Sequence, residues 1–262
     1  MNIFKTSKKS LGQNFLIDQN IINKIIKIGN IEENKTVLEI GSGYGNLTRK
    51  IADMKPKKIY AIEKDVRLVL LLKNFFKDFK NTKIINNDIF NFLENKNLGQ
   101  NIIVFGNLPY NISTQILVSL VLLEKWPPWY EILILMFQKE VADRIACKPG
   151  SKVYGITSVL LQAFYDIEYL FTVEPEVFDP PPKVRSAVIR LSRNQVKELD
   201  CDEKKFQQIV KMAFNQRRKT LRNSLKPLLN DTIKNETIFA ERPEQLSVQQ
   251  FIDLTNLIAP QH

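Results

Sequence analysis

Histidine and cysteine are nearly absent from the chain. Its 262 residues include one histidine, His262 at the C-terminal end, and two cysteines, Cys147 and Cys201. Without an internal histidine we expect no Ser-His or Cys-His nucleophile pair and no histidine-based zinc site. Two cysteines are too few for a cysteine metal cage or a disulfide framework. We therefore predict no metal site and a reducing compartment.

Long apolar runs are also missing. A typical pure run, Leu120–Leu123, is far shorter than the roughly 18 residues that indicate a membrane span. The first ten residues (MNIFKTSKKS) carry basic side chains with no apolar core after them, so we expect no secretory signal. The length allows one large domain, or one with a small companion, and a buried core. These features predict a soluble, cytoplasmic protein that does not bind membranes.

Positive charge is concentrated in one segment. The chain has 38 Lys and Arg against 28 Asp and Glu, a net charge of +10. Residues 183–226 alone hold 13 basic and 4 acidic side chains, and a small basic cluster (Lys5, Lys8 and Lys9) lies near the start. Localised positive charge is typical of a surface that binds a polyanion such as nucleic acid. The alternative is a solvated face of a lysine-rich protein, and charge by itself leaves both open.

Apolar runs alternate with amphipathic stretches over the first 190 residues. Runs with the length of strands lie at 36–40, 58–62, 83–86, 102–106, 131–137, 168–173 and 186–191. Helical periodicity is found at 46–53, 65–76, 91–98, 113–123 and 139–145. Strands that alternate with helices at this spacing predict an α/β domain, with a parallel sheet covered by helices on both faces.

The pattern changes to helices alone after residue 191. Helices are predicted at 203–214, 217–229 and 248–258, and Ser247 with Gln250 has the spacing of a capping box before the last one. We therefore predict two domains, residues 1–194 and residues 195–262, the second small and all-helical.

A glycine-rich turn follows the first predicted strand. The segment Glu39–Gly45 (EIGSGYG) lies between a strand and a helix, where glycines let the backbone approach a ligand closely. Asn46 occupies the third glycine position of a dinucleotide fingerprint, which argues against a hydride-transferring enzyme. Glu63 and Asp88 end the next two strands, where carboxylates could accept hydrogen bonds from ribose hydroxyls and an adenine amino group. This arrangement resembles an S-adenosylmethionine-dependent methyltransferase.

The fourth predicted strand runs into Asn107-Leu108-Pro109-Tyr110. This tetrapeptide is similar to the signature of enzymes that methylate exocyclic amino groups of bases. The N6 lone pair of adenine is delocalised into the ring, so the amino group is a poor nucleophile. The Asn107 oxygen and a backbone carbonyl near Leu108 could accept its hydrogen bonds and aim the lone pair at a methyl carbon. Tyr110 could stack on the extruded base.

Further motifs extend the resemblance over nearly the whole chain, and the sequence is similar to the ribosomal RNA adenine N6,N6-dimethyltransferase family. The segments that carry it are Lys9–Leu16 (KSLGQNFL), Asn107–Thr114 (NLPYNIST), Gln138–Val141 (QKEV) and Phe178–Val184 (FDPPPKV). The resemblance implies a Rossmann-like methyltransferase sheet and S-adenosyl-L-methionine as cofactor. The residues it implies to contact the cofactor are Asn14, Leu16, Gly41, Glu63, Asp88 and Asn107. Phe178 would supply a second stacking face opposite Tyr110.

Relatives that resemble this chain dimethylate two adjacent adenosines in a hairpin near the 3′ end of small-subunit 16S rRNA, late in subunit assembly. The segments 213–225 (AFNQRRKTLRNSL) and 240–247 (AERPEQLS) are similar to this branch. The resemblance implies a small-subunit rRNA partner, and we expect a monomer. Two alternatives stay open: a large-subunit rRNA methylase of the macrolide-resistance type, and a non-catalytic assembly or transcription factor.

Basic residues gather near the start of the helix predicted at 217–229. Arg217, Arg218, Lys219 and Arg222 lie within six residues, and positions 218 and 222 share a helical face. Such a stripe suits the phosphates of an A-form stem. We expect these residues, together with the lysines at positions 5, 8 and 9, to bind RNA. Some of the arginines could instead form ion pairs between the two domains.

Overall fold

The computed structural model describes residues 13–94, 98–121, 128–216 and 218–259. Its main element is a seven-stranded sheet with the strand order β4-β3-β2-β5-β6-β9-β7. The strands are β2 (Thr36–Ile40), β3 (Lys58–Glu63), β4 (Thr82–Asn86), β5 (Ile102–Asn107), β6 (Tyr130–Gln138), β7 (Tyr165–Val173) and β9 (Ser186–Arg193). All seven predicted strands are therefore present in the sheet.

The sheet is mixed, so the prediction of a parallel sheet was wrong at one edge. β4, β3, β2, β5 and β6 run parallel, whereas β9 pairs with β6 in the antiparallel sense. Apolar runs identify strands but carry no information on direction, which depends on how the chain returns to the sheet. In the parallel part, Ile40 pairs with both Ile62 and Gly106. The carboxyl ends of β2, β3 and β5 consequently lie at one edge.

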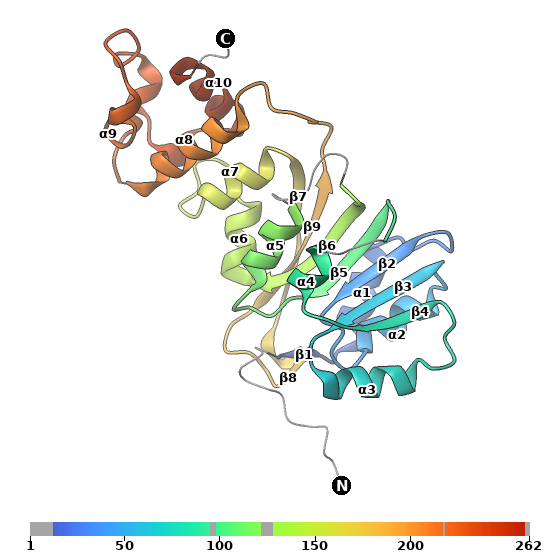
Figure 1. Ribbon diagram of the computed structural model, residues 1–262. Coiled ribbons are helices and arrows are strands. Elements are labelled where there is room, and N and C mark those ends of the chain that lie inside the picture. The colour runs from blue at the N-terminus through green and yellow to red at the C-terminus, as the bar shows by residue number, and fades with distance from the viewer. Residues whose placement is uncertain (1–12, 95–97, 122–127, 217, 260–262) are drawn as a thin grey trace. The chain divides into compact units, whose positions relative to one another are not determined.

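Helices cover both faces of the sheet (Figure 1). They are α1 (Gln19–Ile28), α2 (Asn46–Asp53), α3 (Val66–Phe75), α4 (Ile89–Glu94), α5 (Ser113–Val121) and α6 (Lys139–Ala146). Residues of α1, α2 and α3 share one buried cluster with Val37, Ile103 and Phe105 of the sheet. The next residues along these strands, Leu38 and Val104, are also buried and point to the opposite face, as the period of two in a strand requires.

Two short strands outside the main sheet join distant parts of the chain. β1 (Phe15–Leu16) pairs antiparallel with β8 (Phe178–Asp179), with Leu16 opposite Phe178. The amide of Ile17 also donates to the Val177 carbonyl over 2.9 Å. This pairing ties the segment 13–17, which we call the N-terminal strap, to the loop before β9.

The chain divides into two compact units. One holds the described residues of 1–142 and 168–192, and the other holds those of 143–167 and 193–259. Helix α7 (Ile156–Gln162) thus groups with α8 (Glu203–Asn215), α9 (Leu221–Ser224) and α10 (Val248–Ile258). The domain boundary after residue 194 stays a prediction from the change of sequence pattern.

The single helix predicted at 217–229 was wrong. Among the described residues of that range, α9 spans only Leu221–Ser224, and the 3-10 turn η3 (Lys226–Leu228) follows it. Pro227 lies in the first turn of η3, where it has no amide hydrogen to continue an α-helix. The capping box at Ser247 and Gln250 is present at the start of α10. None of the helices in the described residues has the length and apolar character needed to cross a bilayer.

Candidate active site

A cleft opens at the carboxyl edge of the parallel strands and holds about 210 Å³ of cavity. Most of the predicted catalytic and cofactor-binding residues line it, and a smaller cavity of about 40 Å³ adjoins it below the glycine turn. The predicted residues in the cleft are Asn14, Gly41, Glu63, Asp88, Asn107, Leu108 and Tyr110. Leu16 lines the smaller cavity. Residues up to 96 positions apart in the chain are therefore brought together by the segment before β1 and the ends of β2, β3, β4 and β5.

The glycine turn after β2 needs a backbone that only glycine adopts without strain. Gly43 and Gly45 have φ angles of +56° and +83°. A Cβ atom on Gly43 would lie 2.8 Å from the Phe15 ring, and one on Gly45 would lie 2.7 Å from Leu72. The turn therefore packs directly beneath the strap, and larger residues would push the strap away from the cleft.

Glu63 is held by two backbone amides. Its Oε2 atom accepts from Gly43 over 2.9 Å and its Oε1 atom accepts from Asp65 over 2.8 Å. Burial raises the pKa of this carboxyl, and the amide hydrogen bonds only partly offset that effect. Each oxygen keeps a second lone pair for the cleft. The fixed carboxylate can accept from the two neighbouring hydroxyls of a ribose, so these acceptors suit the nucleoside end of S-adenosylmethionine.

Asp88 is held at the end of β4 by a lysine. The Lys64 ammonium donates to Oδ2 over 2.7 Å and the Phe90 amide donates to Oδ1 over 2.9 Å. Burial acts to raise the pKa of Asp88, but these hydrogen bonds outweigh it and the pKa lies below its usual value. Asp88 consequently stays ionised at neutral pH and can accept a hydrogen bond from an adenine amino group.

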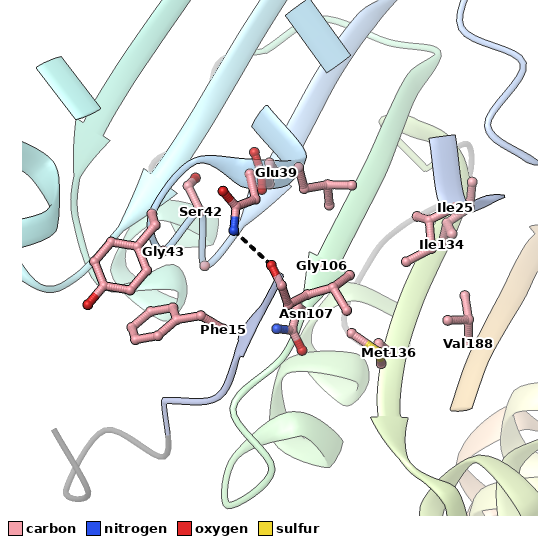
Figure 2. A pocket seen from close by; sticks show the side chains of 15 residues that line it. Phe15, Ile25, Glu39, Ser42, Gly43, Gly106, Asn107, Ile134, Met136 and Val188 are labelled. Carbon is pink, nitrogen blue, oxygen red and sulfur yellow. Dashed lines mark hydrogen bonds between the residues drawn. The ribbon is translucent and has the colours of Figure 1, made fainter. Parts of the chain in front are cut away.

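The strap is tied to the sheet by two asparagine side chains. Asn107 Nδ2 donates to the Asn14 carbonyl over 2.9 Å, and Asn46 Nδ2 donates to the Leu16 carbonyl over 2.9 Å. The second bond is the dashed line in Figure 2, beside Asn107 and Gly106. Asn46 appeared in the sequence only as a missing glycine, and its role in holding the strap was not predicted. The first bond uses one amide hydrogen of Asn107 and leaves its side-chain carbonyl oxygen to accept.

A third contact holds the strap at its N-terminal side. Gln13 donates to Asp65 over 3.3 Å, while Arg67 donates to the same carboxylate over 2.6 Å. The bond from Arg67 is the main reason that the pKa of Asp65 falls to about 2. Phe15 packs on Tyr44 with ring centroids 4.3 Å apart. These contacts hold residues 13–15 beside the cleft, and the contact of Asn14 with the cofactor, which the family resemblance implies, stays a prediction.

The two aromatic residues predicted to stack on the base lie in different surroundings. Tyr110 lines the cleft and is partly buried, and burial raises the pKa of its phenol. Phe178 is only 2% exposed and packs in the core cluster beneath β1. A ring this buried has no free face for a base. The predicted stacking of Phe178 therefore requires β1 and β8 to move.

A second buried carboxyl lies behind the cleft. Glu39 in β2 is 2% exposed, lines the smaller cavity and accepts a hydrogen bond from the Thr48 hydroxyl. Burial raises the pKa of Glu39 to about 8, with a smaller contribution from the nearby charge of Glu63. Glu39 is therefore neutral at pH 7, and its proton keeps an uncompensated charge out of the core.

The basic residues of the helical unit are solvent-exposed. Arg218 and Lys219 lie in a turn, and Arg222 lies on the exposed side of α9 while Leu221 and Ser224 face inward. The expectation that 218 and 222 share a helical face was wrong, since α9 begins at residue 221. None of these three forms an ion pair with another described residue. The predicted RNA contacts at positions 5, 8, 9 and 217 lie outside the described residues.

No group of three or more metal-binding side chains occurs within the described ranges.

The family model described as ribosomal RNA adenine dimethylase matches residues 4–259. A protein of Parabacteroides distasonis named ribosomal RNA small subunit methyltransferase A is 48% identical over 257 residues, which cover 97% of this chain and 94% of that protein. A Flavobacterium johnsoniae protein of the same name is 47% identical over 96% of this chain and 95% of its own length.

Two solved structures share the fold. A dimethyladenosine transferase from Plasmodium falciparum superposes with a TM-score of 0.79 at 24% identity, covering 92% of this chain and 95% of that one. The 23S rRNA methyltransferase ErmE superposes with a TM-score of 0.73 at 23% identity, covering 93% and 100%. At these identities the likeness establishes a methyltransferase fold and does not choose between the two ribosomal subunits.

Proposed function

The chain belongs to the ribosomal RNA adenine dimethylase family and is an S-adenosylmethionine-dependent rRNA methyltransferase, and from this premise we propose its target. It dimethylates N6 of two adjacent adenosines in a hairpin near the 3′ end of small-subunit 16S rRNA, late in subunit biogenesis. The choice of subunit is supported by relatives named small subunit methyltransferase A, which are 45–48% identical over nearly the full chain. The enzyme acts in the cytoplasm as a monomer, with the assembling small subunit as partner.

The orientation of Asn107 is the observation that carries the proposed chemistry. Its amide nitrogen donates one hydrogen to the Asn14 carbonyl, and this orientation leaves the side-chain oxygen to accept in the cleft. An adenine amino group that donates to this oxygen and to the Leu108 carbonyl has its lone pair localised and directed. The cofactor supplies the methyl group as part of a sulfonium. Orientation replaces a strong base, which agrees with a site that has no histidine.

The cofactor-binding residues have separate tasks in this proposal. Glu63 accepts from the ribose hydroxyls, Asp88 accepts from the adenine amino group, and Gly41 allows close approach of the backbone. Asn14 and Leu16 belong to the segment that covers the methionine end. Arg218, Lys219 and Arg222 bind phosphates of the rRNA, and the helical segment 195–262 thereby places the hairpin at the cleft.

Replacing Asn107 with alanine tests the chemistry. Loss of one oriented acceptor lowers kcat, measured at saturating S-adenosylmethionine, by about 100-fold to 1,000-fold. Loss of the bond to the Asn14 carbonyl also weakens cofactor binding, so the Kd for S-adenosylmethionine is measured separately. The assay follows transfer of labelled methyl groups to small subunits that lack the modification. Asn34→Ala is the matched control because Asn34 is exposed and distant from the cleft, so it keeps wild-type activity. Wild-type kcat in the Asn107→Ala variant would refute the assignment.

A further inference from the structure

The phenol group of Tyr110 is held by Ser186, the first residue of β9. Its phenol oxygen lies 2.5 Å from the Ser186 hydroxyl oxygen, and either group can donate. We propose that Ser186 is a positioning residue for methyl transfer, which holds the Tyr110 ring in the plane that receives the target adenine. This inference rests on the proposed function, since it names the residue that orients the stacking ring of the same site.

Ser186 is suited to this task because it cannot move easily. It is the first residue of β9, is 0% exposed, and pairs with Gln138 at the end of β6. The neighbouring Arg185 carbonyl accepts from the Lys139 amide over 2.9 Å, which anchors the backbone just before β9. The Ser186 hydroxyl is therefore a fixed point at the rim of the sheet.

Tyr110 lacks a comparable restraint within its own loop. The hydroxyl of buried Ser113 donates to the Tyr110 carbonyl over 3.2 Å, and the Ile112 amide donates to the Pro109 carbonyl over 3.1 Å. These bonds set the backbone of the turn and do not act on the Tyr110 ring. The bond at the phenol oxygen acts on the ring itself and restrains its two side-chain torsions. Burial raises the pKa of the phenol, so the phenol stays protonated and can donate to or accept from Ser186.

The fixed ring has a direct consequence for catalysis. A base that stacks on Tyr110 takes its plane from the ring, and Asn107 presents its acceptor three residues earlier on the same turn. Methyl transfer requires the amino nitrogen to lie in line with the bond between the methyl carbon and the sulfonium sulfur. Small errors in this alignment strongly lower the rate of transfer. Binding of the RNA as a whole depends on phosphate contacts elsewhere. Loss of the bond consequently lowers kcat and leaves the KM for the subunit almost unchanged.

A double-mutant cycle between the two partners tests the proposal. Ser186→Ala removes the bond from β9, and Tyr110→Phe removes it from the ring while keeping the stacking face. Each single variant and the double variant should show the same loss of kcat, about threefold to tenfold. The KM for small subunits and the calorimetric Kd for S-adenosylhomocysteine should stay within twofold of wild type in all three.

Additive losses in the double variant, or a loss in Ser186→Ala that Tyr110→Phe does not share, would overturn the proposal. Either result would mean that Ser186 supports the strand rather than the ring. The result of the double-mutant cycle does not depend on the proposed 16S target, because kcat is measured on whichever rRNA the wild-type enzyme methylates. Failure of the wild type on 16S rRNA would refute the proposed function and leave the cycle interpretable.

Discussion

Replacing Glu63 with glutamine should weaken cofactor binding by a predictable amount. In the wild type both carboxylate oxygens accept backbone amides and still face the cleft. Glutamine has an NH2 group in place of one oxygen. This group is a donor, so it meets the N–H of Gly43 or Asp65 as a second donor and cannot accept from a ribose hydroxyl. Hydrogen bonds to a charged acceptor contribute about 1 to 1.5 kcal/mol more than neutral ones. For two hydroxyls this gives about 2 to 3 kcal/mol, or roughly a 30-fold to 150-fold higher Kd.

Isothermal titration with S-adenosylhomocysteine measures this change. Glu33→Gln is the matched control, because Glu33 is exposed and the substitution removes the same charge away from the cleft. The pH dependence of the Kd for S-adenosylhomocysteine gives a second test of the same carboxylate. Since burial raises the pKa of Glu63, protonation on acidification begins at a higher pH than for an ordinary glutamate, and wild-type affinity falls as the pH falls. A Glu63→Gln Kd within threefold of wild type, with unchanged melting temperature, would refute the role of the carboxylate.

Two further predictions concern stability and RNA binding. Glu39 holds its proton in the folded state up to about pH 8 but releases it near pH 4.5 when unfolded, so the folded state binds more protons between these values. The free energy of unfolding should fall by up to about 1.4 kcal/mol per pH unit from pH 5 to 8. In urea titrations, Glu39→Gln should make the free energy of unfolding less dependent on pH. The same pH dependence in the variant and the wild type would contradict a buried neutral acid at this position. Arg222→Ala should reduce the slope of log Kd against log salt for the 16S hairpin by about 0.7 to 0.9. Lys234→Ala, which removes an exposed lysine paired with Asp231, serves as the control, and equal slopes for wild type and Arg222→Ala would exclude a phosphate contact.

The sequence predicted the sheet well because each strand carries its own signal. Strands such as Thr36–Ile40 and Ile102–Asn107 are rich in apolar residues, and polar or glycine residues mark their carboxyl ends. In a parallel sheet these ends share an edge, so Glu63 and Asn107 could be placed together from sequence alone. Helix α1 was missed although its signal was present, since Asp18 caps it and isoleucines recur on one face.

Features that depend on a distant partner were not predictable in the same way. The strands Phe15–Leu16 and Phe178–Asp179 are two residues long and exist only through their pairing with each other. The bond from Asn46 to the strap spans 30 positions, and the bond between Tyr110 and Ser186 spans 76. No local pattern encodes such contacts. They depend on where the tertiary fold brings the two segments.

Mapping the methylated nucleotides on ribosomal RNA tests the central claim most directly. Small subunits that lack the modification are incubated with the enzyme and S-adenosylmethionine, and primer extension with nucleoside mass spectrometry locates the product. We predict N6,N6-dimethyladenosine at both adjacent adenosines of the hairpin near the 3′ end of 16S rRNA. Methylation of 23S rRNA instead would identify the large-subunit activity. Absence of methylated adenosine from both RNAs would contradict the account.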